Sequence, residues 1–521
     1  MKTFPSIFND VIGPVMRGPS SSHCAASVRI GRIARDLMNC EITDVIIEFD
    51  KNGSLATTHK SQGSDMGLFA GLLGWDATDD RLTDSEKHFK ESGINIKFKI
   101  SDKKDIHPNT YNLKLKNKRK EHNLIAISIG GGSIQIIAVD DFKTSLHGDI
   151  YTTLIFADDN SSGVLKYLHE SIQYDEILLH KSAISALIEL RTTSSLPDDS
   201  IKLIHNNFPK LDIIKIDPVF PVISKYKIDL PFSNCEEMLI YNKSRKLDLW
   251  ELAIIYECER GGLTENEVLN KMQNIITILD NSVEQGIKGT SYSDRIIGYQ
   301  SGKFNSKFKK EQLQGGEAFN RIILYVTALM EVKSSMGLIV AAPTAGSCGG
   351  LPGAVLGIAD SLGLSTLDKT KAMLSAGLIG VFIADQSTFA AETCGCQAEC
   401  GSGSGMAAAA LVSIMGGTVN QALSAASMAI QNTLGMICDP VANRVEVPCL
   451  GKNVMAATNA LSCANMALAG FDEVIPLSQV IETMDRVGKS IPRELRCTGL
   501  GGLSITKASK DIEKRLLSNN D

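Results

Sequence analysis

The residues with the clearest capacity for chemistry are cysteines in the last third of the chain. Cys396, Cys438 and Cys449 lie among glycines, prolines and acidic residues rather than inside apolar helical patterns. Thiolates are soft ligands for zinc, copper or iron–sulfur clusters. The gaps between these cysteines match neither the ferredoxin patterns nor a zinc ribbon. Spacing alone therefore leaves two interpretations open, a soft-metal site and a set of buried thiols.

Two further stretches combine polar groups with irregular backbone. Gly18-Pro19-Ser20-Ser21-Ser22-His23 offers three hydroxyls, an imidazole and backbone N–H groups that could bind a carboxylate. The same residues also suit a turn followed by a helix N-cap, with His23 exposed to solvent. Ala342 to Gly353 holds two prolines and four glycines, which predicts irregular backbone rather than regular helix. Such a loop either lines a site or only connects two elements.

Composition restricts the class of protein. A chain of 521 residues is too long for one compact core and predicts several domains. The net charge of −6, without a basic run, argues against nucleic-acid binding. Met1 to Ser6 are not followed by the apolar core of a signal peptide, so we expect a cytoplasmic, reducing location.

One long stretch carries no charge. Between Cys400 and Cys438 there is no Asp, Glu, Lys or Arg, and the stretch is long enough to cross a membrane. Repeated glycines, Asn and Gln interrupt it, and it is rich in Ala, which favours closely packed buried helices. We therefore predict a central helix bundle and no membrane contact.

The elements that must position these residues fall into three segments. Residues 1–147 are predicted to form an α+β domain that closes near Gly130–Ser133. Its expected strands are Asp44–Phe49, Ile94–Lys99, Tyr111–Lys116 and Leu124–Ile129, and its expected helix is Met66–Leu73.

Residues 148–220 predict the order strand, helix, strand, strand, helix, strand of a ferredoxin-like unit. This unit resembles an ACT-type regulatory domain, with Asp158-Asp159-Asn160-Ser161 at the position of the ligand loop. Helical periodicity dominates residues 236–521 and predicts a mostly α-helical catalytic domain. Its expected helices include Leu247–Glu259, Glu265–Ile287, Phe319–Met336 and Ser365–Ala384.

Motifs from nearly the whole chain resemble the iron–sulfur-dependent L-serine dehydratases, with the β-type and α-type parts fused. The resemblance rests on Gly13–Met16, Gly18–His23, Gly53–Thr58, Gly63–Asp65, Gly130–Ser133, Thr344–Gly353, Gly395–Glu399, Cys438–Cys449 and Gly501–Leu503, in the order of the family. It implies an L-serine ammonia-lyase that forms pyruvate and ammonia, in amino-acid catabolism and gluconeogenesis. It also implies a cytoplasmic homodimer that binds a small amino acid and neither nucleic acid nor membrane.

The same resemblance implies the cofactor and the site residues. A [4Fe–4S] cluster is expected on Cys396, Cys438 and Cys449, with one open iron acting as a Lewis acid on the leaving hydroxyl. The expected substrate-binding residues are Ser20, Gln62, Thr344, Ala345, Gly346 and Ser347, and the expected catalytic residues are Ser21, Ser22, His23 and His59. The base that removes the α-proton stays open between His23, His59 and a serine alkoxide.

Several departures from the family pattern leave the substrate open. Gln62 stands where the family has a histidine before Gly63-Ser64-Asp65. Glutamine is no base near neutral pH, so Gln62 would shift the base to His59 or His23, or accommodate another polar group on the substrate. Cys394 and Cys400 flank Cys396 and could compete as ligands. The tail Leu516–Asp521 lacks the cysteine that some relatives place on the open iron.

Other functions stay open as alternatives. A related dehydratase would act on another β-hydroxy amino acid. A pyridoxal-phosphate dehydratase needs a Schiff-base lysine and a phosphate loop; Gly130-Gly131-Gly132 is the one tri-glycine, and no lysine lies in a suitable motif. A non-catalytic iron–sulfur or amino-acid sensor would keep the cluster without turnover.

The cysteine assignment makes a direct prediction. Replacing Cys396, Cys438 or Cys449 by Ala should abolish cluster binding, because each would supply one of three protein ligands. Cys40→Ala and Cys463→Ala should leave it intact. Iron content after anaerobic reconstitution measures this, and full iron in Cys438→Ala would contradict the assignment.

Overall fold

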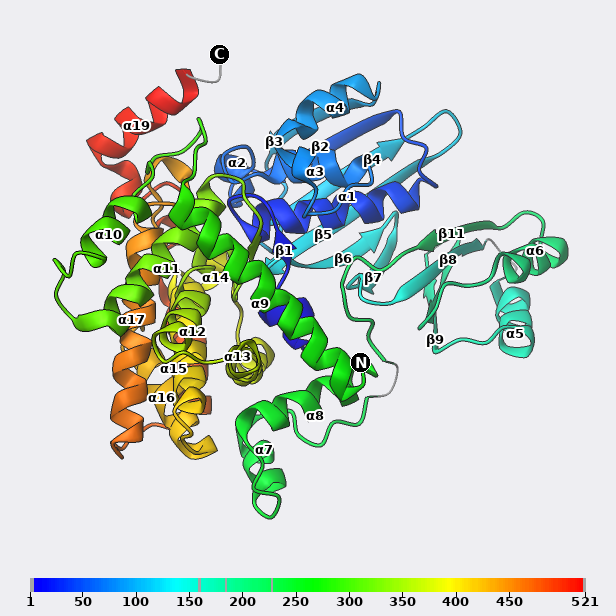
Figure 1. Cartoon of the computed structure of the whole chain (residues 1–521). Helices are drawn as coiled ribbons and strands as arrows, with labels where there is room; N and C mark the ends of the chain where they lie inside the picture. The colour runs from blue at the N-terminus through cyan, green and yellow to red at the C-terminus, as the bar shows by residue number, and fades with distance from the viewer. Residues whose placement is uncertain (1–3, 158–160, 183–184, 226–227, 519–521) are drawn as a thin grey trace.

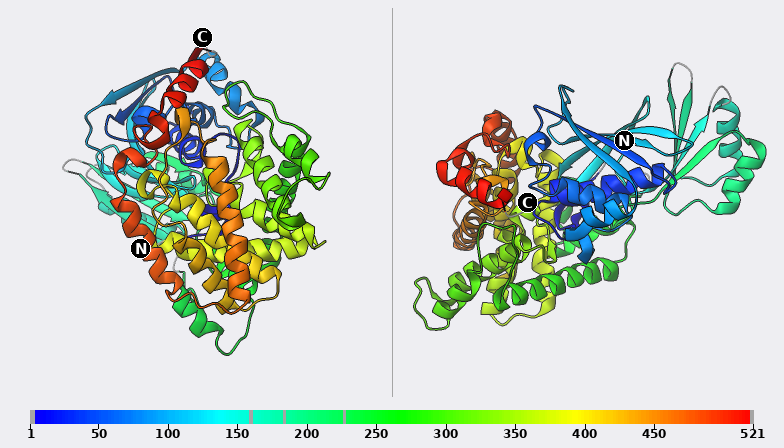
Figure 2. Two further views of the ribbon diagram at one scale, coloured as in Figure 1. Left: turned by 90° about the vertical axis from the view of Figure 1, so that its left-hand side faces the viewer. Right: turned by 90° about the horizontal axis from the view of Figure 1, so that it is seen from above.

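The computed structural model describes residues 4–157, 161–182, 185–225 and 228–518 (Figure 1). A helical part carries Cys396, Cys438 and Cys449, a sheet domain lies against it, and a smaller α/β unit projects from the sheet domain away from the helices (Figure 2). The predicted multidomain organisation, with mixed α/β structure first and helices last, is confirmed in this coarse form.

The sheet domain is built on six strands in the order β3-β2-β4-β5-β6-β7, in which β2 and β3 are the parallel pair. The strands are β2 (Asp44–Asp50), β3 (Asn95–Ser101), β4 (Thr110–Lys116), β5 (Glu121–Gly130), β6 (Ser133–Val139) and β7 (Phe142–Leu146). Helices α1 (Ala26–Leu37), α2 (Leu55–Thr58), α3 (Ser64–Leu72) and α4 (Ser85–Glu91) complete the domain. Helices α1 and α3 cross closely because Gly31 faces Gly71; a Cβ on Gly31 would lie 2.9 Å from the Gly71 Cα.

The expectation that this domain closes near Gly130–Ser133 is wrong. These residues form the tight turn between β5 and β6, and β6 and β7 extend the sheet to Leu146. All three glycines of the turn have positive φ, a conformation that glycine adopts without steric cost. A run of glycines marks a turn, and it does not distinguish a turn inside a sheet from a domain boundary.

The smaller unit has the expected element order. Its elements are β8 (Tyr151–Ala157), α5 (Ser161–Ser171), β9 (Glu176–Lys181), β10 (Ala186–Thr192), α6 (Asp198–Asn207) and β11 (Asp212–Ile216). The strands form an antiparallel sheet in the order β11-β8-β10-β9. Leu154, Leu187 and Ile214 on one face join the core of the sheet domain, while α5 and α6 cover the other face. An ACT-type assignment stays a prediction, and Asp158, Asp159 and Asn160 of the expected ligand loop lie outside the described residues.

The last segment is a helix bundle. Its helices are α7 (Cys235–Asn242), α8 (Leu249–Gly261), α9 (Glu265–Lys288), α10 (Ser301–Phe308), α11 (Gly316–Ser334), α12 (Gly350–Ser361), α13 (Thr366–Gln386), α14 (Ala391–Cys394), α15 (Ser402–Ile414), α16 (Val419–Gln431), α17 (Cys449–Leu468), α18 (Leu477–Ser490) and α19 (Lys507–Ser518). The uncharged stretch forms α15 and α16, which pack on α13 and α17 in the middle of the bundle. Within the described ranges, no helix is long and apolar enough to cross a membrane.

The expected irregular stretch 342–353 is only partly irregular. Residues 342–349 form a loop with one short 3-10 turn, η4 (Ala345–Ser347), but α12 begins at Gly350. Pro352 lies in the first turn of α12, where its missing N–H removes no intrahelical hydrogen bond. The prediction of non-helical backbone is therefore wrong for residues 350–353.

An N-terminal segment joins the sheet domain to the bundle. The π-helical turn η1 (Ile7–Val11) packs on α13, and Ile7 N–H donates to Glu257 Oε2 of α8 at 2.8 Å. Strand β1 (Val15–Met16) then pairs with β12 (Ile339–Val340), so that Val15 faces Val340. The two polar loops at 18–23 and 342–349 start from this shared ribbon.

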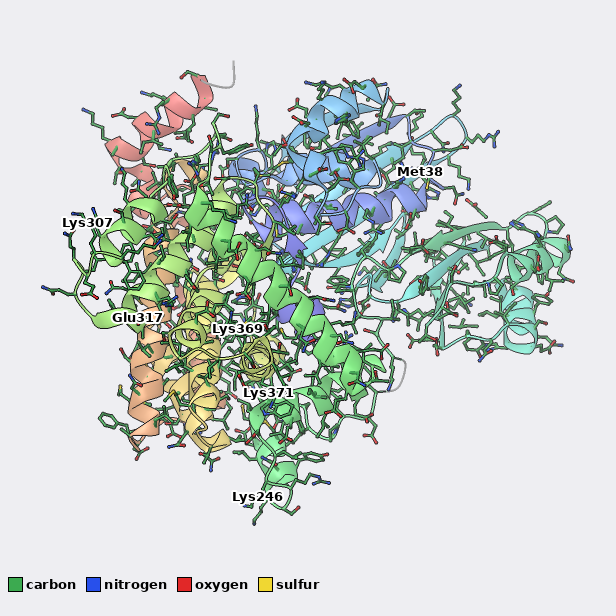
Figure 3. The ribbon with its side chains drawn as sticks, in the orientation of Figure 1. Met38, Lys246, Lys307, Glu317, Lys369 and Lys371 are labelled. Carbon is green, nitrogen blue, oxygen red and sulfur yellow. The ribbon has the colours of Figure 1, made fainter. Side chains whose placement is uncertain are left out.

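A buried lysine links three helices of the bundle and gives a stability prediction. Lys369 lies on α13 (Figure 3). Its side chain is 9% exposed and lies 3.1 Å from Asp280 of α9 and 2.8 Å from Asp360 of α12. Lys369→Met should lower the free energy of unfolding by about 2 kcal/mol, because it leaves two partly buried carboxylates without their cation. Lys371→Met on the same helix is the matched control, since that lysine lies over the Trp250 ring. Chemical denaturation measures both, and equal losses would contradict the prediction.

Candidate active site

Five buried thiols gather in the bundle, where several chain segments approach one another. They are Cys396, Cys400, Cys438, Cys449 and Cys497. Cys396 precedes the π-helical turn η5 (Gln397–Gly401), and Cys449 begins α17. The Cys396 and Cys400 sulfurs are 3.5 Å apart, and the thiols of Cys438 and Cys497 are hydrogen-bonded to each other. The structure therefore brings together the three predicted ligands and two further cysteines.

Cys394 does not join this group. Its sulfur lies 3.9 Å from Asp485 Oδ1, on the side of α18. A Cβ on Gly488 of α18 would meet the Cys394 sulfur at 2.8 Å, so the thiol is packed against that helix. Of the two flanking cysteines that could compete with Cys396, only Cys400 is close to it.

The surroundings shift the pKa values of the individual thiols in different directions. The hydrogen bond with Cys400 and the nearby Lys452 cation lower the pKa of Cys396, against the effect of burial. The hydrogen bond with Cys497 and burial raise the pKa of Cys438, and burial raises the pKa of Cys449. Lys452 is held by Asp439 Oδ1 at 3.0 Å and Ile437 O at 2.6 Å. This arrangement favours one thiolate, and metal binding would have to release protons from the others.

The donor atoms of the three predicted ligands are sulfurs, which are the ligands of soft metals and of iron–sulfur clusters. Among the described side chains, no three His, Cys, Asp or Glu are grouped closely enough to hold one metal ion. Cys396, Cys438 and Cys449 come from three separate segments, and all three are buried. An all-sulfur, water-excluded set of this kind is suited to a cluster.

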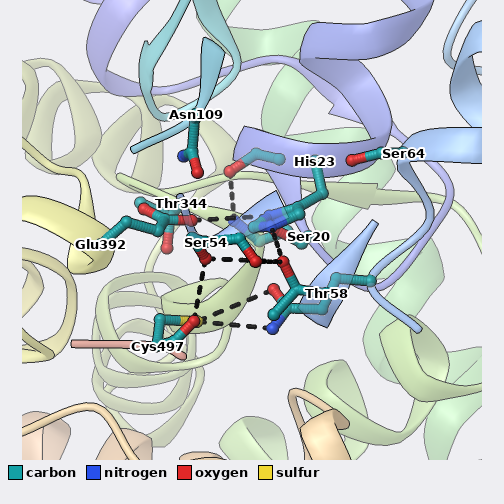
Figure 4. Close-up of polar contacts among 12 residues, drawn as sticks. Ser20, His23, Ser54, Thr58, Ser64, Asn109, Thr344, Glu392 and Cys497 are labelled. Atoms are coloured by element: carbon teal, nitrogen blue, oxygen red, sulfur yellow. Dashed lines mark hydrogen bonds and ion pairs between the residues drawn. The ribbon is translucent and has the colours of Figure 1, made fainter. Parts of the chain in front are cut away.

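The loop of residues 18–23, called the serine loop below, lies at the N-terminus of α1, and its histidine is fully buried. His23 Nδ1 is 3.0 Å from Ser20 Oγ and 3.5 Å from Glu392 Oε1, and its Nε2 is 2.8 Å from Thr58 Oγ1 (Figure 4). The interpretation with an exposed His23 is therefore wrong. Burial, and then the charge of His59, lower the pKa of His23 from 6.5 to about 3. The imidazole is thus neutral near neutral pH.

The two predicted carboxylate-binding loops meet. The Ala345 N–H donates to Ser21 Oγ at 3.1 Å, although the two residues are far apart in the sequence. Thr344 Oγ1 donates to Glu399 Oε1 at 2.6 Å and lies 3.1 Å from Ser347 Oγ. Asn453 Nδ2 of α17 donates to Gly346 O at 2.8 Å. Because Glu399 belongs to η5, these contacts connect both loops to the cysteine segment.

Ser22 is buried in the same loop, in the turn η2 (Ser21–Ala25) that precedes α1. Together the loop supplies three hydroxyl groups to one end of α1, as the sequence predicts.

Gln62 and His59 have different surroundings. Gln62 is 1% exposed, and its Nε2 donates to the Cys497 sulfur at 3.4 Å. His59 is hydrogen-bonded to Asp65 at 2.7 Å and packs against the rings of Phe49 and Phe98. Gln62 therefore lies beside the five buried thiols, whereas a catalytic role of His59 stays a prediction.

Two residues that the sequence patterns did not single out face the serine loop. Asn109, just before β4, is fully buried, and its side-chain amide is hydrogen-bonded to the Glu392 carboxyl of α14 (Figure 4). Burial raises the pKa of Glu392, against the lowering effect of its hydrogen bonds. Glu392 also lies 3.5 Å from His23, so these two residues extend the polar group around the imidazole.

Comparisons with known proteins agree with this arrangement. Residues 244–504 match the family model described as serine dehydratase alpha chain. A probable L-serine dehydratase alpha chain of Bacillus subtilis is 34% identical over 285 residues, which cover 55% of this chain and 95% of that protein. The probable beta chain of the same organism is 40% identical over 156 residues, which cover 30% of this chain and 70% of the beta chain. An L-serine dehydratase of Streptomyces coelicolor is 26% identical over 498 residues, which cover 94% of this chain and 96% of the relative.

These matches place the helical part in the serine dehydratase alpha-chain family. The whole chain belongs to the L-serine dehydratase family, in the form that joins the two kinds of chain in one polypeptide.

The burial of His23 predicts a pH dependence of stability. The folded-state pKa of about 3 lies below the ordinary value of 6.5, so the unfolded chain binds the proton more readily. The stabilising contribution is complete above the unfolded pKa and is lost as the pH falls from there toward the folded pKa, by up to about 1.4 kcal/mol per pH unit. His23→Gln should flatten this part of the profile. Urea unfolding between about pH 5 and 7 measures it, and parallel profiles would contradict the prediction.

Proposed function

We propose that the chain converts L-serine to pyruvate and ammonia. The observation that carries the proposal is the contact of the serine loop with the 344–347 loop, beside the buried thiols, in a member of this family. Relatives that align over almost the entire chain have the name L-serine dehydratase. A pyridoxal-phosphate enzyme would leave the thiol group without a role.

The substrate carboxylate is proposed to bind between the two loops. Ser20, Ser21 and Ser22 offer hydroxyl donors at the start of α1. The substrate ammonium is proposed to bind at the buried Glu392 carboxyl and Asn109 Oδ1, which can accept hydrogen bonds. This orientation leaves the β-hydroxyl toward the thiols.

A [4Fe–4S] cluster on Cys396, Cys438 and Cys449 would supply a Lewis acid for the departing hydroxyl. The three cysteines would hold it, and Lys452 would balance part of its negative charge, since this cation already lowers the pKa of Cys396. The helix bundle around the thiols excludes water from the site, which strengthens the charge interactions within it.

The α-proton is proposed to pass to His23. The neutral imidazole has two hydroxyl neighbours, Ser20 and Thr58, through which a proton can move. A pKa near 3 makes His23 a weak base in the resting site. Glu392, 3.5 Å from Nδ1, would stabilise the imidazolium as it forms and so raise its basicity during the reaction.

A second candidate substrate follows from Gln62. The side chain is buried against the thiol group, where its amide both donates and accepts hydrogen bonds. An additional polar group on another β-hydroxy amino acid could bind there. A sensor function without turnover remains the non-enzymatic alternative.

The location, the oligomeric state, the metabolic role and the role of the smaller unit are proposals as well. We infer a cytoplasmic homodimer that acts in amino-acid catabolism and supplies pyruvate for gluconeogenesis. The four-stranded unit would bind an amino acid or mediate assembly, because its residues take no part in the thiol group or the serine loop.

Anaerobically purified protein should release pyruvate from L-serine, and lactate dehydrogenase coupling measures it.

Glu392→Gln should lower kcat by at least ~10²-fold, because the amide cannot stabilise an imidazolium. His59→Ala is the comparison, and it should retain most of the activity. The absence of pyruvate would contradict the proposed function. A larger loss in His59→Ala than in Glu392→Gln would assign the base to His59, and faster turnover of another β-hydroxy amino acid would favour the second candidate.

A further inference from the structure

We propose that a cavity between the sheet domain and the bundle binds a monocarboxylate that has a branched apolar chain and no ammonium group. Arg29 would hold the carboxylate, and the apolar wall of the cavity would enclose the chain. The lining residues include none of the buried thiols and none of the serine loop. The site therefore does not depend on the proposed function.

The cavity has a volume of about 480 Å³, which is within the range of small-molecule sites. Its lining comes from the segment that leads into β1, from α1, from α9 and from residues 218–221, which follow the last strand of the smaller unit. Helices α1 and α9 and strand β1 come together in this part of the molecule (Figure 1). The cavity thus lies where several units of the chain meet.

Most of the wall of the cavity is apolar. Val28 of α1 and Ile275 of α9 are buried and line it from the two helices. Phe8 and Ile12, which precede β1, are also buried and line it from the N-terminal segment. A hydrocarbon chain gains free energy on entering such a space, because its apolar surface leaves water.

Arg29 supplies a buried cation with unused donors. The residue is 5% exposed, its Nη1 donates to Gly132 O at 2.6 Å, and its guanidinium carbon lies 3.9 Å from the centre of the Phe220 ring. Within the described part of the chain, its Nε and Nη2 make no hydrogen bond. These two nitrogens form one edge of the guanidinium, which matches the two oxygens of a carboxylate.

The charge of Arg29 is incompletely balanced by its neighbours. Burial lowers the pKa of Arg29 to about 10, against the raising effects of Asp10 and Asp76. The guanidinium is still charged near neutral pH, so a carboxylate that binds it would replace part of the lost hydration.

The other charged residues of the lining favour an anion as well. Lys271 of α9 lines the cavity and donates to Pro221 O at 3.2 Å. Of the described lining residues, Asp76 alone is a carboxylate, and it already pairs with Arg32 at 2.9 Å. Three cations for one carboxylate attract a negative ligand and repel an ammonium group. An amino acid is therefore a poor ligand for this cavity, although its carboxylate and side chain would fit.

The position of the cavity connects it to the elements that hold the serine loop. Arg29 lies near the start of α1, which follows the turn that contains His23. Gly13, Pro14 and Val15 of the lining lead into the pairing of β1 with β12. A ligand in the cavity would contact both elements and hold α1 against α9.

Isothermal titration calorimetry on the anaerobically purified full chain tests the proposal. The probes are 4-methylpentanoate and L-leucine, which share the carboxylate and the branched chain and differ by the ammonium group. We expect 4-methylpentanoate to bind at least ~10-fold more tightly, since a like-charge contact is costly. A third probe, 4-methyl-2-oxopentanoate, should also bind more tightly than leucine, and its affinity relative to 4-methylpentanoate shows whether an oxo acid or a fatty acid is the better ligand.

Two variants and a control place the ligand in the cavity. Arg29→Met should weaken the binding of 4-methylpentanoate by at least ~10-fold, the scale of a hydrogen bond to a charged group. Lys271→Met should weaken it severalfold, and because this lysine is only partly buried, the variant decides if Arg29→Met does not fold. Arg35→Met is the matched control and should bind like the parent, since Arg35 lies on α1, outside the lining, and donates to Leu72 O.

Three outcomes would overturn the proposal. They are the absence of binding, an affinity for 4-methylpentanoate no higher than that for L-leucine, and an affinity in Lys271→Met equal to that of the parent.

Discussion

The pairing of β1 with β12 is the contact on which the site depends. It joins two residues near the N-terminus to two residues in the middle of the bundle sequence, and both polar loops emerge from it. The hydrogen bond from Ala345 to Ser21 can form only because these strands hold their loops in register. Buried apolar contacts of η1 with α13 hold the segment that precedes the ribbon.

The site combines polar groups that would be unfavourable in isolation. Several buried thiols, carboxylates and an imidazole share a region with few cations, of which Lys452 and Lys333 act most directly on the thiols. Burial disfavours the charged form of each group: it lowers the pKa of His23 and raises the pKa values of Glu392 and Cys449. In such surroundings, an interaction with a charged ligand is stronger than it would be in water.

Much of the site could be predicted from the sequence because it is encoded in local motifs. Gly18–His23 and Thr344–Ser347 carry unusual densities of hydroxyl and glycine residues, and their meeting is confirmed. The uncharged stretch around α15 and α16 is buried, as its composition indicates. The observed ends of α9 and α13 lie within a few residues of the predicted ones.

The remainder depends on tertiary contacts that no local pattern specifies. Asn109 and Glu392 are common residue types in ordinary surroundings, and only tertiary packing brings them near His23 (Figure 4). Cys497 stands alone in the sequence, and backbone pairing with Cys438 brings it to the other buried thiols. The burial of His23 was missed because a polar loop at a helix start usually faces solvent, whereas here the bundle covers it.

The placement of the smaller α/β unit gives α1 a second role. Strand β11 contacts α1, and the Asp217 N–H donates to Asp36 near the C-terminal end of that helix at 3.1 Å. The other end of α1 follows directly from His23 and the three serines. A helix of twelve residues is about 18 Å long and stiff. Helix α1 therefore connects the smaller unit directly to the serine loop. A ligand that shifts β11 would move α1 and so change the affinity of the loop for substrate. Substrate binding would in turn change the affinity for that ligand by the same factor.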